Sequence, residues 1–158
     1  MAEMEGLSTL LPVEAILLRQ VAADWRAAVR LAGRALAASG ATDATYADEM
    51  ISTVEDLGPY IVIAPGVALA HARPSPAVHR TGLSWVGLAT PVLFGHPHND
   101  PVRLVVGLAA VDEHAHIEAL ATLAGLLSDD ERRSALEAAL TPSDLHALVE
   151  AAEHEPAV

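Results

Sequence analysis

The chain contains no cysteine and no lysine among its 158 residues. Without cysteine, disulfides, thiolate metal sites and a cysteine nucleophile are excluded. Arginine supplies all 9 basic residues against 21 acidic ones, which leaves a formal net charge of −12. So acidic a chain lacks the basic surface that neutralises the phosphates of nucleic acids, and the same charge disfavours anionic membranes. An acidic face does suit a basic protein partner.

Long hydrophobic runs are also missing. The nearest approach to a membrane span, residues 57–72, is broken by Pro59, Pro65 and Gly66. The first residues lack the basic start and apolar stretch of a signal peptide, so we predict a cytoplasmic protein. A hydrophobic fraction of 52% indicates a globular chain. We expect a single domain over residues 1–158, with its core at about 7–150, a frayed start and a disordered tail at 153–158.

Several catalytic motifs are absent as well. The chain has no P-loop and no Gly-x-Gly-x-x-Gly, so it does not resemble a nucleotide enzyme, and no cofactor is expected. It has no Gly-x-Ser-x-Gly elbow to support a serine hydrolase. If it moves phosphoryl groups, it takes them from another carrier.

The apolar pattern predicts helices and strands in mixed order. Apolar residues recur every three or four positions from Trp25 to about Leu36, behind an N-cap at Asp24 and before Ser39-Gly40. A second helix is predicted over 44–54, starting at Thr42 or Asp43, and a third opens at His116. The capping box of Ser128 and Glu131 predicts a helix over 129–139, and another follows at 142–152. A short helical turn is expected at 7–11. Predicted strands are 60–64, 67–70, 81–88, 90–93 and 102–110. Residues 15–18 fit a first strand, and they fit a helix equally well. This order predicts an α/β (α+β) fold with a single mixed β-sheet flanked by helices.

One stretch, residues 64–74, organises the functional interpretation. Pro65-Gly66 predicts a turn, and the apolar run that follows is the length of a buried strand. The run ends at His71, with Arg73 two residues on. Imidazole acts as a nucleophile or base near neutral pH, and guanidinium suits phosphate or carboxylate oxygens. The pair suggests chemistry on a phosphoryl or carboxyl group, although a histidine at a strand end is often only a rim residue.

Other histidines leave further possibilities open. His116 follows the end of the 102–110 strand, so it would meet His71 if the two strands are neighbours. The pairs His96-x-His98 and His114-x-His116 also allow a metal site, hence a metal-dependent hydrolase, although neither pair lies in a predicted strand. We expect the three remaining histidines to lie on the surface: His79, His146 and His154.

The stretch Ile63–Pro74 resembles the active-site signature of the enzyme IIA components of the bacterial phosphoenolpyruvate-dependent sugar phosphotransferase system. The resemblance is to the mannitol/fructose type (type 2), and within it to the ascorbate/galactitol-like branch, which shows a Pro-His-Ala-Arg-Pro core. It extends from about Leu7 to Val149. Further matching segments are Trp25–Val29, Phe94–Pro97, Asn99–Val102, and His116-Ile117 followed by Leu120, Leu123 and Leu126–Ser128.

This resemblance implies a phosphoryl relay for carbohydrate uptake, of the ascorbate type. His71 would be phosphorylated by the carrier protein HPr and would pass the group to a cysteine of a cognate IIB domain. His116 matches the second active-site histidine of the family. On physical grounds, we expect Arg73 and His116 to meet the charge of the phosphoryl group during transfer. The alternative within the family is a regulatory IIA-like domain that feeds no transporter.

The chain departs from the family pattern at two places. Ala70 precedes the active histidine where the family usually has proline. Mannitol-type relatives carry an arginine upstream of that histidine, and the matching region around Glu55 has none. We therefore hypothesise that Arg73 takes its role, with Ser52 and Thr53 adding hydroxyl groups.

Overall fold

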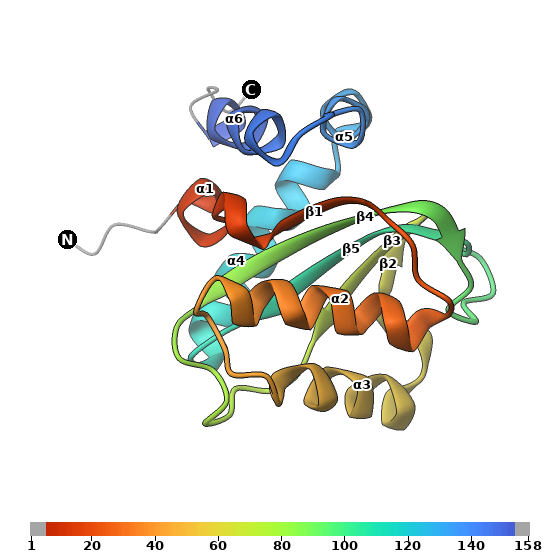
Figure 1. Cartoon of the computed structure of the whole chain (residues 1–158), viewed down its shortest axis with the longest axis vertical. Coiled ribbons are helices and arrows are strands. Elements are labelled where there is room, and N and C mark those ends of the chain that lie inside the picture. The colour runs from red at the N-terminus through yellow and green to blue at the C-terminus, as the bar shows by residue number, and fades with distance from the viewer. Residues whose placement is uncertain (1–5, 154–158) are drawn as a thin grey trace.

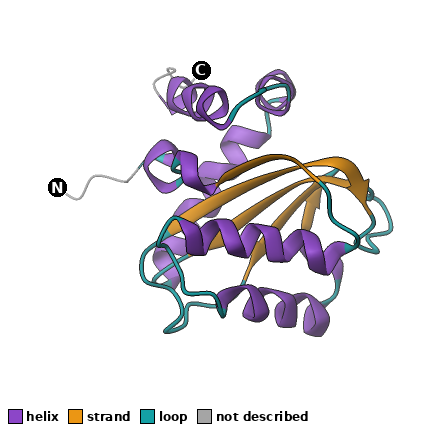
Figure 2. Cartoon of the chain, viewed as in Figure 1, coloured by secondary structure: helices purple, strands orange, loops and turns teal. Residues whose placement is uncertain are grey.

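A computed structural model of the protein describes residues 6–153. Figure 1 and Figure 2 show one mixed sheet with helices on both faces, which confirms the predicted fold class. The predictions for residues 1–5 and 154–158 lie outside the described residues, and the single domain stays a prediction. The strands are β1 Ile16–Gln20, β2 Val62–Ala64, β3 Val67–His71, β4 Gly82–Val92 and β5 Val102–Ala109. The helices are α1 Leu7–Leu10, α2 Trp25–Ala38, α3 Tyr46–Leu57, α4 Glu113–Leu127, α5 Asp130–Glu137 and α6 Pro142–Glu153, with 3-10 turns η1 Val13–Ala15 and η2 Pro59–Ile61.

The strand order is β1-β4-β5-β3-β2. Strands β3 and β5 are neighbours and run parallel, with His71 opposite Leu108 in the register. Strand β4 runs antiparallel to β5, and Gly82 at its start faces Ala109 at the end of β5. The carboxyl ends of β3 and β5 therefore meet at one end of the sheet, which is where α/β proteins usually place their sites.

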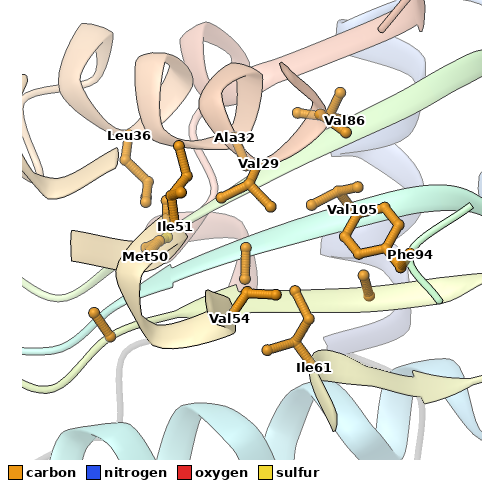
Figure 3. Close-up of a cluster of buried hydrophobic side chains, with 14 of the residues drawn as sticks. Val29, Ala32, Leu36, Met50, Ile51, Val54, Ile61, Val86, Phe94 and Val105 are labelled. Atoms are coloured by element: carbon orange, nitrogen blue, oxygen red, sulfur yellow. The ribbon is translucent and has the colours of Figure 1, made fainter. Parts of the chain in front are cut away.

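Helices α2 and α3 cover one face of the sheet (Figure 1). Asp24 caps α2 by accepting a hydrogen bond from the Ala27 amide at 2.9 Å, as predicted. The two helices approach closely, because a Cβ on Gly33 would lie 2.5 Å from the Cβ of Ala47. Their buried side chains pack with those of β4 and β5 into the core shown in Figure 3. Its members include Val29, Ala32, Leu36, Met50, Ile51, Val54, Ile61, Val86, Phe94 and Val105.

Helix α4 covers the opposite face, with α1, α5 and α6 beyond it (Figure 1). A second core forms there from residues of α1, of the sheet and of the three C-terminal helices. It includes Leu10, Leu69, Trp85, Leu104, Val106, Leu123, Leu127, Leu136 and Leu145. The side chains of β3 alternate between the two cores, since Ala68 and Ala70 belong to the first, and Val67 and Leu69 to the second.

Some element boundaries differ from the sequence prediction. Tyr60 is not in a strand, because Pro59 opens the η2 turn and β2 begins only at Val62. The two predicted strands at 81–88 and 90–93 form the single strand β4, since β5 pairs along it as far as Val92. Glu153, expected in the tail, is the last residue of α6, which no glycine or proline ends earlier.

Three helix starts were also misplaced. Ser128 is not an N-cap: it has helical dihedrals at the end of α4, and the extended residue Asp129 caps α5 by accepting from the Arg132 amide. Helix α3 begins only at Tyr46, because Asp43 accepts the Thr45 amide in a turn before it.

The third misplaced start is that of α4. His116 does not open this helix, because Asp112 caps it by accepting from the Ala115 amide at 2.8 Å. The extended backbone of Asp112 places the first helical residue at Glu113. His116 consequently lies in the first turn of α4, close to the end of β5.

Candidate functional site

His71 is the last residue of β3 and is half-buried. Its Nδ1 lies 3.0 Å from the carbonyl oxygen of Leu69. A carbonyl oxygen only accepts, so Nδ1 carries a proton and donates it. In the neutral form of the ring the lone pair therefore lies on Nε2, which is the nitrogen that can act as a nucleophile.

His116 presents a second imidazole beside it. The centroids of the His71 and His116 rings lie 5.3 Å apart, with an angle of 57° between the planes. We predicted that His71 and His116 would meet if their two strands were neighbours. Strands β3 and β5 are neighbours in the sheet. Burial, and next the proximity of His71, lower the pKa of His116 below 6.5, and the Glu113 carboxylate opposes the shift. His116 is therefore a neutral hydrogen-bonding group at neutral pH.

The two rings open onto a cavity of about 730 Å³ at the end of the sheet. Helix α3 forms one wall, α4 forms another, and the segment after β3 lies between them. Its lining residues are Asp48, Glu49, Ser52, Thr53, Asp56, Leu57, His71, Ala72, Arg73, Pro74, Ser75, Glu113, His116 and Ile117. The cavity therefore combines two imidazoles, one guanidinium, four carboxylates and an apolar rim of Leu57 and Ile117, whose side chains are exposed.

Arg73 is exposed and belongs to this lining. The region around Glu55, where the sequence analysis finds no upstream arginine, contributes acidic groups. There, Glu55 pairs with Arg26 at 3.1 Å and Asp48 pairs with Arg30 at 3.2 Å. Both pairs are exposed and link α3 to α2. Arg26 and Arg30 therefore pair with carboxylates and are not part of the cavity lining. Arg73 is the positive charge that the lining itself supplies.

The hydroxyl groups named by the sequence analysis also line the cavity. Thr53 donates to the carbonyl oxygen of Glu49 at 3.0 Å, which occupies its hydroxyl proton within α3. Ser52 is exposed at the cavity wall. One further group was missed: the hydroxyl of Tyr46, which the pattern identified only as a core residue, reaches the backbone beside His71. Apolar periodicity carries no signal for such a bond.

The other histidines have separate roles. Nδ1 of His96 accepts the backbone amides of His98 and Asn99, so it shapes its own loop. His114 is exposed and pairs with Glu118 one turn along α4 at 3.0 Å. Within residues 6–153, no three His, Asp or Glu side chains are grouped so that they could hold a metal ion.

His79 is exposed, as predicted, whereas His146 is only partly exposed. Nε2 of His146 lies 2.9 Å from the carbonyl oxygen of Ser8, because α6 packs against α1. His154 lies outside the described residues.

The cavity at the ends of two parallel strands thus holds two adjacent imidazoles and a guanidinium, which are groups that suit chemistry on a phosphoryl group. A family model described as "phosphoenolpyruvate-dependent sugar phosphotransferase system, EIIA 2" matches residues 9–152, so the chain belongs to that family. The members of this family are phosphotransferase components, and the chain is accordingly a component of a phosphoryl relay.

Individual relatives agree with the family model. SgcA, named as a phosphotransferase IIA component of Escherichia coli (strain K12), is 40% identical over 128 residues, or 81% of this chain and 90% of that protein. The ascorbate-specific PTS system EIIA component of the same strain is 36% identical over 138 residues, or 87% of this chain and 90% of that protein. The name of the second relative confirms the resemblance to the ascorbate-type branch.

A solved structure shares the fold. It is the complex of enzyme IIA of the mannitol system and phosphorylated enzyme IIB from Escherichia coli. The similarity has a TM-score of 0.77 and 26% sequence identity, and covers 90% of this chain and 99% of that one. In that protein, a IIA domain is bound to a IIB domain. Finally, none of the helices within residues 6–153 has the length and apolar character needed to cross a membrane.

Proposed function

We propose that Nε2 of His71 accepts a phosphoryl group from phosphorylated HPr and passes it to a cysteine of a IIB domain. The observation that carries this proposal is the hydrogen bond from Nδ1 of His71 to the carbonyl oxygen of Leu69. This bond makes Nδ1 the protonated nitrogen, so in the neutral ring the lone pair lies on Nε2, and the ring itself lines the cavity. A nucleophile prepared in this way needs no separate base.

The two transfers balance in bonds and protons. In the first, the bond from His71 Nε2 to phosphorus forms while the phosphorus–nitrogen bond of the donor's histidine breaks. The Nδ1 proton stays on the ring, so the phosphorylated imidazole is a good leaving group. In the second, the sulfur–phosphorus bond of the IIB cysteine thiolate forms as the Nε2 bond breaks, and His71 returns to its neutral state.

His116 and Arg73 would stabilise the charge of the phosphoryl group during both transfers. A ring whose centroid is 5.3 Å from that of His71 is near enough to donate a hydrogen bond to a group held on Nε2. Arg73 would contribute a fixed positive charge to the same cavity. Catalysis would then consist mainly of positioning and electrostatic stabilisation.

The surroundings of the cavity suit visiting proteins. Leu57 and Ile117 are each 64% exposed and flank the entrance from α3 and α4. The acidic residues around them favour a partner with a basic rim. The similarity to a IIA–IIB complex of the mannitol system supports a IIB domain as one partner. The relay would operate in the cytoplasm, since phosphoenolpyruvate is a cytoplasmic metabolite.

For the carbohydrate, we propose uptake of the ascorbate type. The name of one relative at 36% identity supports this assignment. The cavity itself would contact only the phosphoryl group and the protein partners, so it selects the IIB domain and not the sugar.

The test is phosphorylation in a purified system. The protein is incubated with phosphoenolpyruvate, enzyme I and HPr, and the labelled residue is identified by mass spectrometry. We expect label on His71 and none in His71→Gln, whereas the exposed control His79→Gln should be labelled like the wild type. Undiminished labelling of His71→Gln would overturn the assignment, and adding an ascorbate-type IIB domain should discharge the label onto its cysteine.

A further inference from the structure

The hydroxyl of Tyr46 makes a bridge at the end of the sheet. Tyr46 is the first residue of α3 and is fully buried, with 0% of its surface exposed. Its oxygen accepts a hydrogen bond from the amide of Ala72 at 3.0 Å and lies 2.9 Å from the carbonyl oxygen of Leu108, to which it donates. The carbonyl oxygen of Ala72, at 3.2 Å, is a second acceptor.

The residues that the bridge joins are directly connected to the site. Ala72 follows His71, and Leu108 is the partner of His71 in the register of β3 and β5. Beyond this pair the two strands separate, β3 toward Arg73 and β5 toward α4 and His116. The hydroxyl is therefore inserted between the strands at the point where both histidine-bearing segments leave the sheet.

From this geometry we propose that Tyr46 is a positioning residue, whose hydroxyl holds the ends of β3 and β5 so that His71 and His116 face one another. Tyr46 also begins α3, the helix that forms the facing wall of the cavity. One hydroxyl thus ties α3 to the end of β3 and to β5, the strand that leads into α4. The role rests on the proposed function, because it concerns the placement of the proposed acceptor.

The chemistry of the phenol agrees with this role. Burial raises the pKa of Tyr46 to about 12, and Glu49 adds to the rise although the bond to the Ala72 backbone opposes it. The hydroxyl therefore stays protonated across the physiological range and donates and accepts at once. Phenylalanine fills the same volume but leaves the Ala72 amide and the Leu108 carbonyl without this partner.

The test compares Tyr46→Phe with Ser84→Ala. Ser84 is also fully buried, and its hydroxyl donates to the Ala32 carbonyl at 2.8 Å, away from the cavity lining. Ser84→Ala loses one buried hydrogen bond and Tyr46→Phe loses at least two, so both variants should unfold at a lower temperature. Only Tyr46→Phe should lower the rate of phosphoryl transfer from saturating phosphorylated HPr, by about tenfold to a hundredfold. Small misplacements of reacting groups lower rates by about this factor.

The concentration of phosphorylated HPr that gives half the maximal rate should change less than about twofold, because Tyr46 is buried and makes no contact with a partner. Equal slowing in Ser84→Ala, or a wild-type rate in Tyr46→Phe, would overturn the positioning role. A wild-type protein that accepts no phosphate would instead overturn the proposed function.

Two measurements on unphosphorylated protein decide the positioning role independently. Nuclear Overhauser contacts between the rings of His71 and His116 should be present in the wild type and in Ser84→Ala, and weakened in Tyr46→Phe. In the wild type, the amide of Ala72 should exchange as slowly as the paired amides of β3. Rapid exchange at Ala72, or unchanged ring contacts in Tyr46→Phe, would contradict the proposal whether or not the variant is active.

Discussion

Gly66 and Arg103 are in contact at the end of the sheet opposite the cavity, where a Cβ on Gly66 would lie 2.1 Å from Nη1 of Arg103. Gly66 has a φ of 77° and turns the chain from β2 into β3. Its amide donates to the Asn99 carbonyl, and its own carbonyl accepts the amide of Arg103. The turn, the 93–101 loop and the start of β5 are thereby locked together.

The first prediction concerns this turn. Gly66→Ala should lower the free energy of unfolding by about 1–2 kcal/mol, because a side chain in this backbone region is strained. The guanidinium of Arg103 would also have to move, which disturbs its 3.1 Å pair with Glu137. The measurement is urea unfolding, and Gly125→Ala in α4 is the control, since a Cβ there meets nothing within 4 Å. A control that loses as much stability as Gly66→Ala would contradict the argument.

The second prediction concerns the guanidinium in the cavity. Arg73→Ala should slow transfer from phosphorylated HPr by about 10²–10³-fold, the usual cost of losing one group that stabilises developing charge. Arg73→Lys keeps the positive charge but lacks the planar guanidinium group, so its transfer rate should lie between those of the wild type and Arg73→Ala. Rapid-quench kinetics would measure the rates. The control is Arg34→Ala, at an exposed position on α2, which should transfer at the wild-type rate. A wild-type rate in Arg73→Ala would contradict a role of Arg73 in the site.

The third prediction concerns pH and stability. Because the folded-state pKa of His116 is below its ordinary value of 6.5, the stability linked to neutral His116 is complete above pH 6.5 and is lost as the pH falls through the folded value. The wild type should lose more unfolding free energy than His116→Gln between about pH 7 and pH 5.

The groups around His116 define the control for this experiment. His71 and Glu113 act on it most directly, and Arg73 and the carboxylates Asp48, Glu49 and Asp56 line the same cavity. His114→Gln removes an exposed histidine from the same turn of α4 and should follow the wild-type curve. Superimposable curves for the wild type and His116→Gln would refute the linkage.

The fourth prediction distinguishes two candidate caps of α5. Asp129→Ala should cost about 0.5–2 kcal/mol of unfolding free energy, because Asp129 accepts the Arg132 amide at 3.1 Å. Ser128→Ala should cost much less, since the Ser128 hydroxyl donates only to the Gly125 carbonyl at an exposed position. Chemical denaturation of both variants would decide, and a larger loss for Ser128→Ala would favour the capping box that the sequence suggests.

The sequence predicts most of the fold because its signals are local. Asp24 before an apolar period places the start of α2, and the apolar runs place β3 and β5. The errors occur where neighbouring residues compete for one role, as Ser128 and Asp129 do. There a carboxylate on an extended residue becomes the cap, and the serine stays in the preceding helix.

The site could be predicted only in part for a related reason. His71 and Arg73 belong to one short segment, so they are visible in the sequence. His116 requires knowing that β3 and β5 are neighbours, which the order of elements leaves open. The bond from Tyr46 to the backbone of Leu108 joins residues 62 positions apart, and no pattern of residue types encodes it.

The walls of the cavity come from opposite faces of the sheet, with α3 packed in the first core and α4 in the second. Neither layer of helices could form this hollow alone, because it exists only where both project past the ends of the same strands. A fragment that kept just one layer would lack one wall of the cavity and would have lost either Tyr46 or His116. Assembly of the complete fold must therefore precede any capacity to hold a group between the two rings.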